Sequence, residues 1–408
     1  MLNIILTRTY DGDCMKIFNG KNLGEIYPFP HINLPIFPQE GEINQFQSNR
    51  FFYSAINRNL SASTLIPVAK GASYLILPST VNIPELSDYY KNTYGESHTG
   101  RYDNLRFCSN KEYALKSIEL SRQTGNKIVS IVPYINNPYS YVDVKLYSTV
   151  QSKWNIRQLT NQIAKQYLVK LSNFEKIIET NQLQFPLFVK GNFGSGGDYV
   201  VKANSIGEVK SQKTETFIIE ENFRHDINFN IQTHISPKGE IRYVGGSTQL
   251  VEGTVYVGNI IDLKSTPDTI PNVVYDIINE ASQNVYKQGW HGLAGWDILY
   301  RKADNQAILI DPNLRWNGAT TFMILGKTIA QQTRRKYILQ CSISSRKFQQ
   351  VSEGMNHLQR FLNNGDLFII GGSYQDDKEG YFKLRIGITG NEVAELHEKR
   401  RFFEKILW

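Results

Sequence analysis

The chain has 408 residues, 41% of them apolar, and a formal net charge of +7 from 45 basic and 38 acidic residues. This length and composition allow large buried cores and predict two to three domains. No apolar run approaches the roughly 20 residues of a membrane span, and residues 1–6 have neither the length nor the basic leader of a signal peptide. We therefore expect a cytoplasmic protein.

The cysteines and the charges exclude several other classes of protein. Cys14, Cys108 and Cys341 are far apart and odd in number, which fits a reducing compartment and no metal-ligand spacing. The positive charge suits an anionic small molecule or an acidic partner, or it is general surface charge. Basic residues are dispersed apart from residues 399–401 and no RNA-module string occurs, so nucleic acid is not the expected partner.

The first 150 residues predict a parallel α/β domain. Short apolar strands are predicted at residues 2–6, 74–78 and 128–133, and residues 111–122 between them are helix-like. Strands that alternate with helices are typical of a parallel sheet. The proline- and asparagine-rich residues 133–138 mark the end of this domain.

A helix is predicted to begin at Ser152. Ser152 suits the N-cap, and Ile156, Leu159 and Ile163 recur at helical spacing behind it. Lys153 lies in the first turn of this predicted helix. It is either a solvated lysine or part of a binding site, and the helix alone does not decide between them.

A glycine-rich loop follows the buried strand predicted at residues 187–189. Lys190 ends that strand, four glycines lie between residues 191 and 197, and a second strand is predicted at residues 199–202. Backbone N–H groups of such a loop can approach a phosphate without interference from Cβ atoms, and Lys190 would add a mobile positive charge. The candidate phosphate-binding residues are Lys190, Gly194, Ser195, Gly196 and Gly197. A flexible hairpin with an exposed lysine is the alternative.

Three other nucleotide motifs do not fit this loop. A P-loop needs its lysine after the glycines, whereas Lys190 precedes them. The dinucleotide fingerprint needs a third glycine where Tyr199 stands. A protein kinase would carry an Asp-Phe-Gly string, and the chain has none.

The next segment predicts a sheet. Residues 216–221 form a strand that ends in the acidic pair Glu220 and Glu221, and Asp226 precedes an alternating strand at residues 227–231. Further strands are predicted at residues 240–244, 247–251 and 253–259. A helix over residues 271–288 carries an apolar stripe that we assign to the core: Val274, Ile277, Ile278, Ala281 and Val285.

A hairpin with two aspartates follows this helix. Residues 292–300 and 307–314 are apolar runs, and the polar residues between them suit a turn, so we predict an antiparallel pair. Asp297 and Asp311 would then face each other across the two strands. Asn313 and Arg315 share the face of Asp311 because side chains alternate along a strand.

Two carboxylates and an amide oxygen on one face form a site for a hard cation. Mg²⁺ suits Asp297, Asp311 and Asn313 because it takes one or two carboxylates and leaves positions for water and phosphate oxygens. The Arg315 guanidinium could hold a developing oxyanion. The alternative is a pair of solvent-exposed aspartates at a hairpin end, one of them paired with the arginine.

Residues 329–408 have a different pattern. A basic, glutamine-rich helical stretch leads to strands at residues 367–370 and 381–388, with an acidic turn between them. A charged helix ends the chain.

Taken together, the lysine loop, the acidic residues 218–222 and the Asp-x-Asn-x-Arg strand at residues 311–315 resemble the ATP-grasp superfamily of carboxylate–amine ligases. The resemblance covers roughly residues 152–321. Asp311 stands where that superfamily usually has the longer glutamate, so we expect the metal geometry to differ slightly from the usual one. The order of preceding domain, core and tail is similar to that of antibiotic-pathway ligases of the pheganomycin type, and of ligases that load an amino acid on a carrier protein.

The resemblance implies an α/β (α+β) ATP-grasp fold in four parts. These are a Rossmann-like α/β domain at residues 1–150, a lysine and glycine-loop lobe at 151–222, a metal and substrate lobe at 223–328, and a small C-terminal α+β extension at 329–408. It also implies roles for individual residues. Lys153 would bind a phosphate, Glu220 and Glu221 would lie at the adenine, and Asp226 would bind the ribose.

The implied enzyme is an ADP-forming ligase that uses ATP and Mg²⁺. It would activate a carboxylate as an acyl phosphate and pass it to an amine, forming a peptide or amide bond in secondary metabolism. Arg315 and Lys190 are the predicted catalytic residues, and the substrates would be small molecules. Three alternatives stay open: loading of a carrier-protein thiol, a phosphotransferase, and a non-catalytic nucleotide-binding module.

Overall fold

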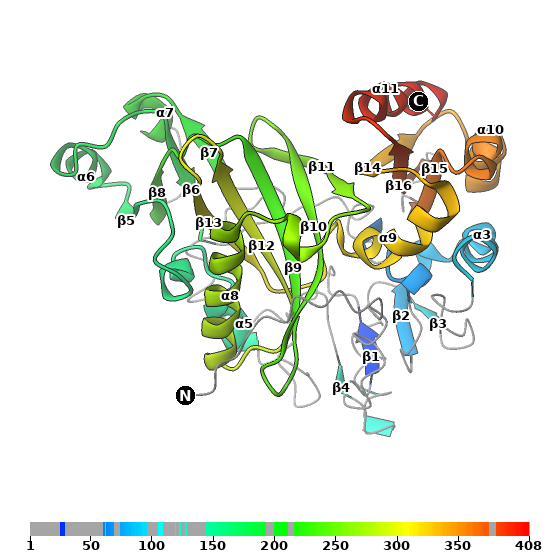
Figure 1. The fold of residues 1–408 in the computed structure, drawn as a ribbon, viewed down its shortest axis with the longest axis horizontal. Coiled ribbons are helices and arrows are strands. Elements are labelled where there is room, and N and C mark those ends of the chain that lie inside the picture. The colour runs from blue at the N-terminus through cyan, green and yellow to red at the C-terminus, as the bar shows by residue number, and fades with distance from the viewer. Residues whose placement is uncertain are drawn as a thin grey trace.

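The computed structural model describes residues 25–28, 60–61, 63–68, 74–95, 105–108, 119, 122–123, 127–128, 144–192, 200–210, 216–374 and 381–407. The described strands form two four-stranded sheets and one eight-stranded sheet. In Figure 1 the eight-stranded sheet extends from the middle of the molecule to the upper right, one four-stranded sheet lies at the left, and the N-terminal sheet lies at the lower right.

The N-terminal sheet is parallel, as predicted. Its order is β3-β2-β1-β4, and each described pair runs parallel. The strands are β1 (Glu25–Pro28), β2 (Tyr74–Pro78), β3 (Leu105–Cys108) and β4 (Lys127–Ile128), with helix α3 (Pro84–Tyr94) and the 3₁₀ turns η2 (Ile66–Val68) and η3 (Ser79–Val81). The strand predicted at residues 74–78 is confirmed. The strand predicted at residues 2–6 lies outside the described residues, as does most of the helix predicted at 111–122.

The second sheet is antiparallel and has the order β5-β8-β6-β7. Its strands are β5 (Gln166–Lys170), β6 (Leu187–Lys190), β7 (Val200–Ala203) and β8 (Thr216–Glu221), with helices α6 (Phe174–Thr180) and α7 (Ile206–Lys210). Phe174, Leu187, Val189 and Phe217 are buried in its core. The two strands predicted on either side of the glycine loop pair through Lys190 and Val200. The loop residues Gly194, Ser195, Gly196 and Gly197 lie outside the described residues.

The central sheet has the order β13-β12-β9-β10-β11-β14-β16-β15, and its described pairs are antiparallel. The strands are β9 (Ile227–Ile235), β10 (Ile241–Glu252), β11 (Val255–Asp262), β12 (Gly292–Arg301), β13 (Gln306–Asn313), β14 (Tyr337–Ser345), β15 (Leu367–Tyr374) and β16 (Phe382–Gly390). The C-terminal strands β14, β15 and β16 therefore continue the sheet that carries the hairpin.

Helices cover this sheet at several places (Figure 1). They are α5 (Val144–Val150), α8 (Asn272–Lys287), α9 (Thr320–Thr333), α10 (Val351–Asn363) and α11 (Val393–Leu407), with the 3₁₀ turns η5 (Asn155–Gln158) and η6 (Pro267–Thr269). The helix predicted at residues 271–288 is confirmed, and its apolar stripe is buried in the core against β9, β12 and β13.

Three predicted elements are wrong. The helical stretch predicted between residue 329 and the strand at 367 is interrupted by the strand β14, whose residues pair with β11 and β16. The strands predicted at 240–244 and 247–251 are one strand, β10, because Gly245 lies inside it and lets α9 approach. A Cβ atom on Gly245 would lie 2.8 Å from Cβ of Met323. The helix predicted from Ser152 is only the short 3₁₀ turn η5, because the Ser152 hydroxyl bonds Asn192 on another segment.

Candidate active site

The hairpin β12–β13 brings two carboxylates together. Asp297 and Asp311 are direct partners across the two strands, and Asn313 pairs with Gly295 two positions further on. The turn between the strands is closed by Arg301, whose Nε and Nη2 donate to Asp304 at 2.8 and 2.7 Å. The predicted hairpin and the pairing of its aspartates are confirmed, whereas their role as metal ligands stays a prediction.

Neutral amides surround the Asp297 carboxylate. Asn230 Nδ2 and Gln249 Nε2 donate to its Oδ1 at 2.6 and 2.8 Å, and Asn313 Nδ2 donates to its Oδ2 at 2.8 Å. Burial and the negative charge of Asp311 raise the pKa of Asp297 to about 6. A cation at this carboxylate would relieve both effects.

Asp311 has a different environment. Its Oδ2 forms an ion pair with Nζ of Lys153, and its Oδ1 is buried with no hydrogen-bond partner among the described residues. A buried carboxylate oxygen without a donor costs free energy unless a cation or a proton satisfies it. The oxygen donors therefore fit a divalent cation held by Asp311 and Asp297. No group of three or more His, Cys, Asp and Glu side chains suited to a metal occurs in the described part of the chain.

Asn313 differs from the prediction in its contacts. Its Nδ2 donates to Asp297, and its Oδ1 accepts a hydrogen bond from Nη1 of Arg315 at 2.6 Å. The hydrogen bond from Arg315 uses one of the two lone pairs of this amide oxygen, and the second one could bind a cation. The structure thus brings Arg315 into direct contact with the predicted metal residues.

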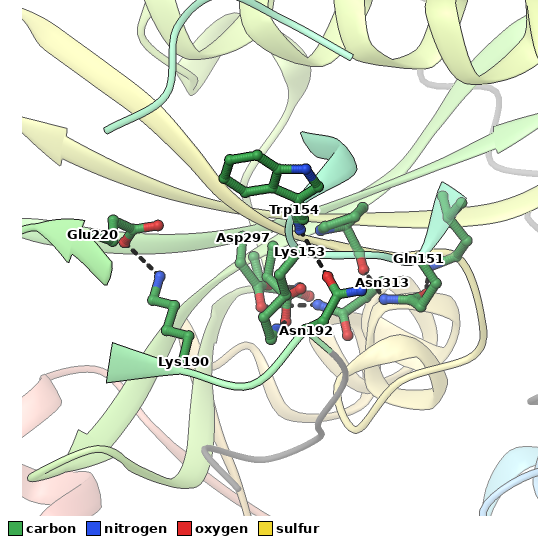
Figure 2. A network of polar contacts seen from close by, with 12 residues as sticks. Gln151, Lys153, Trp154, Lys190, Asn192, Glu220, Asp297 and Asn313 are labelled. Carbon is green, nitrogen blue, oxygen red and sulfur yellow. Dashed lines mark hydrogen bonds and ion pairs between the residues drawn. The ribbon is translucent and has the colours of Figure 1, made fainter. Parts of the chain in front are cut away.

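A short segment before η5 connects the hairpin to the end of β6 (Figure 2). The Ser152 hydroxyl and the Trp154 N–H donate to Oδ1 of Asn192 at 2.7 and 2.9 Å, and the Lys153 N–H donates to the Asn192 carbonyl at 3.0 Å. Asn192 lies two residues after Lys190. The two candidate lysines are therefore on segments that are hydrogen-bonded to each other.

Lys190 also faces a carboxylate. Its Nζ forms an ion pair with Oε1 of Glu220, and both side chains are buried. Gln166 Nε2 donates to the other oxygen of Glu220 at 2.7 Å. Glu221 is partly exposed, and its carboxylate lies 3.6 Å from Nζ of Lys165. Figure 2 shows the Lys190–Glu220 pair in one view with Lys153, Asn192 and Asp297.

Asp226 lies apart from the carboxylate pair. It precedes β9, four residues before Asn230, which is about 13 Å of extended strand. Its N–H donates to the Tyr300 carbonyl at 2.9 Å, and its Oδ2 accepts the Lys302 N–H at 2.7 Å. Its side chain is exposed. Ribose binding by Asp226 remains a prediction.

Several polar contacts of the site were not predicted from the sequence. Asn192 was read only as part of the glycine loop, and Asn230 was not singled out although it is a buried amide in the strand β9. Its register partner Asp297 becomes visible only when β9 and β12 are known to pair. Gln249 lies in the strand predicted at residues 247–251, whose pattern does not reveal its contact with Asp297.

Several enzymes of known structure have the same fold as this chain. A structure of N5-carboxyaminoimidazole ribonucleotide synthetase in its ADP complex aligns with a TM-score of 0.58 at 14% identity, over 100% of this chain and 98% of that chain. The Staphylococcus aureus enzyme with ADP aligns with a TM-score of 0.58 at 11% identity, over 93% and 96%. The Aspergillus clavatus enzyme with ATP aligns with a TM-score of 0.54 at 13% identity, over 85% and 95%. The chain has the ATP-grasp fold.

The sequence supports the same class. Residues 164–313 match the family described as "L-aspartate--L-methionine ligase, ATP grasp". This range includes β6, the acidic end of β8 and the hairpin with Asp297 and Asp311. The family match over residues 164–313 and the shared fold together indicate an enzyme of the ATP-grasp type. In the described part of the chain, no helix is long and apolar enough to cross a membrane.

Proposed function

We propose that this enzyme uses ATP to activate the carboxylate of an amino acid or a related acid as an acyl phosphate, and transfers the acyl group to an amine. The observation that carries the proposal is that Lys153 and Arg315 lie at the paired strand positions of Asp297 and Asp311. Lys153 forms an ion pair with Asp311, and Arg315 reaches Asp297 through Asn313. The name of the matched family, which joins two amino acids, supports amino acids as both substrates and a peptide bond as the product.

The chain's own residues account for the binding of the triphosphate. Lys153 and Lys190 are two cations that can bind phosphate oxygens, and each is paired with a carboxylate that it can exchange for phosphate. Asp297 and Asp311, with the Asn313 oxygen, would hold Mg²⁺, which when bound neutralises charge between the β- and γ-phosphates.

The transfer then follows in two balanced steps. An oxygen of the substrate carboxylate attacks the γ-phosphorus, and ADP leaves. The amine nitrogen attacks the acyl carbon, phosphate leaves, and the amine loses a proton. Arg315 donates a hydrogen bond to Asn313 beside the carboxylate pair and would stabilise the oxyanion of the tetrahedral intermediate.

A substrate screen tests this proposal. Phosphate release is measured with ATP, Mg²⁺ and a panel of amino acids, offered alone and in pairs, and the products are identified by mass spectrometry. We expect stoichiometric ADP and phosphate only when an acid and an amine are both present, with a condensed product. Formation of a stable phosphorylated product instead would show a phosphotransferase.

The biological role proposed from the resemblance is peptide formation in secondary metabolism, with soluble small-molecule substrates. A carrier-protein thiol would be detected in the same screen if an added carrier protein replaced the amine. A thioester product would then replace the amide.

A further inference from the structure

We infer that Lys153 occupies the place of a divalent cation at Asp311, and that it thereby couples binding of the metal to binding of the nucleotide. The inference rests on the proposed function, because it takes nucleotide phosphates as the anions that draw Lys153 away. It concerns how the same site is regulated.

The negative charge of Asp311 in the hairpin is balanced by Lys153. The Lys153 and Asp311 side chains are 8% and 18% exposed, and their ion pair is the contact that neutralises Asp311. Asp297 beside it receives hydrogen bonds from the amides of Asn230, Gln249 and Asn313. Asp311 is thus paired with the ammonium group of Lys153, whereas Asp297 is held by neutral amides.

Replacing the Lys153 ammonium group at Asp311 by a divalent cation costs free energy. A divalent cation at the two carboxylates would repel an ammonium group held at the same oxygen. Lys153 would then have to leave Asp311, and a buried ammonium without a partner is expensive. Phosphate oxygens of a nucleotide supply that partner. Metal alone should therefore bind weakly, and metal with nucleotide should bind much more tightly.

Lys153 and Lys190 differ in what their carboxylate partners retain when the lysine leaves. When Lys190 leaves Glu220 for a phosphate, the Glu220 carboxylate keeps the hydrogen bond from Gln166. Asp311 has no such second donor among the described residues, and its Oδ1 already lacks a partner. Release of Lys153 therefore requires a new cation at Asp311, whereas release of Lys190 requires none at Glu220.

The backbone around Lys153 fits this exchange. The Lys153 N–H and the Trp154 N–H are both bonded to Asn192, so the backbone is fixed on the β6 side. Only the flexible side chain has to swing from carboxylate to phosphate. The exchange needs no rearrangement of the hairpin.

The experiment measures Mn²⁺ binding to the full chain without nucleotide by electron paramagnetic resonance. Lys153→Met removes the competing cation, and we expect it to tighten Mn²⁺ binding about tenfold or more, equivalent to one exchanged ion pair of about 1.4 kcal/mol. Lys153→Arg keeps the cation and should bind Mn²⁺ as weakly as the unchanged chain. Lys210→Met removes the exposed ion pair of Lys210 with Glu175 and should have no effect.

Two further measurements make the result decisive. The double variant Lys153→Met, Asp311→Asn should lose the increase in Mn²⁺ affinity that Lys153→Met produces. That loss would show that the increase depends on Asp311. In the unchanged chain, a non-hydrolysable ATP analogue should tighten Mn²⁺ binding more than tenfold, and this factor should shrink in Lys153→Met.

Unchanged or weaker Mn²⁺ binding in Lys153→Met would overturn the inference. Equal Mn²⁺ affinity of the unchanged chain with and without the analogue would overturn it as well, and this measurement does not depend on the variant folding. A failure of the proposed ligase activity would appear separately, as absence of product in the substrate screen, while the nucleotide-free Mn²⁺ result would still stand.

Discussion

At the scale of single residues, the two aspartates of the hairpin carry the same charge in different surroundings. Asp297 is held by three neutral amides, and Asp311 by an ammonium group. A neutral donor stabilises a carboxylate less than a cation does. Asp297 is therefore the group whose protonation should change within an accessible pH range.

This difference predicts a pH dependence of metal binding. The pKa of Asp297 is raised to about 6, so below that pH a proton competes with the metal for its carboxylate. Apparent Mn²⁺ affinity should be constant above about pH 7 and fall by up to tenfold for each unit below pH 6. Titrations between pH 5 and 8 check this, and an affinity that stays level down to pH 5 would argue against a raised pKa at a ligand.

Asp311 provides the matched test of catalysis. Asp311→Asn preserves the shape of the side chain and removes the charge that Lys153 and a cation share. We expect ADP release that depends on the acid and the amine to fall at least 100-fold, with an unchanged circular dichroism spectrum. Turnover near that of the unchanged chain would remove Asp311 from the metal site.

The sequence predicted the charged residues of the site better than their contacts. Lys190, Asp297, Asp311 and Arg315 were predicted because each lies at a strand end or in an alternating strand, where local pattern decides the face. The partner of each lysine was not predicted. Pairing of Lys153 with Asp311, and of Lys190 with Glu220, depends on how separate segments meet, and periodicity within one segment carries no such information.

At the scale of elements, glycines decide how closely strands and helices approach. Gly258 in β11 is the tightest case, because a Cβ atom there would lie 2.3 Å from the Gln340 carbonyl oxygen. That oxygen belongs to the backbone of β14 and cannot rotate away. Gly245 in β10 allows a similar close approach of Met323 in α9.

Gly258→Ala should therefore destabilise the fold. We expect a loss of about 1–3 kcal/mol, since the added methyl group forces the β11 and β14 backbones apart. Gly207→Ala is the control, because its Cβ atom would meet only the Ser205 hydroxyl at 3.8 Å and alanine favours a helix. Thermal melting of both variants measures the difference, and equal melting temperatures would contradict the packing argument.

The segment after Ser152 shows why an element prediction failed. Ile156 and Leu159 are buried, so the apolar spacing correctly marked inward-facing residues. It could not reveal that Ser152 and Trp154 bond Asn192, which fixes the backbone as a turn. The apolar spacing in the sequence predicted which residues are buried. The backbone conformation, in contrast, depends on hydrogen bonds to a distant segment.

At the scale of the whole molecule, the C-terminal residues complete the central sheet. β14 pairs with β11 and with β16, and β15 pairs with β16. The sequence predicted the last two strands and the terminal helix, whereas β14 lies within a stretch that was predicted to be helical. Their place in the same sheet as the hairpin could not be predicted, because strand order depends on non-local pairing.

Truncation should expose this dependence. A chain that ends at residue 335 loses β14, β15 and β16 and leaves the edge of β11 unpaired, so we expect it to aggregate. A chain that lacks only α11 keeps every described strand paired and should stay folded with a lower melting temperature. Gel filtration distinguishes the two, and a monomeric, folded chain ending at residue 335 would contradict the role assigned to these strands.

The most direct test of the account follows one oxygen atom. The acid identified in the substrate screen is labelled with ¹⁸O in its carboxylate, and the phosphate released during turnover with ATP is analysed by mass spectrometry. Activation as an acyl phosphate predicts one ¹⁸O atom in each phosphate, together with ADP. Unlabelled phosphate, or AMP and pyrophosphate as products, would contradict the account.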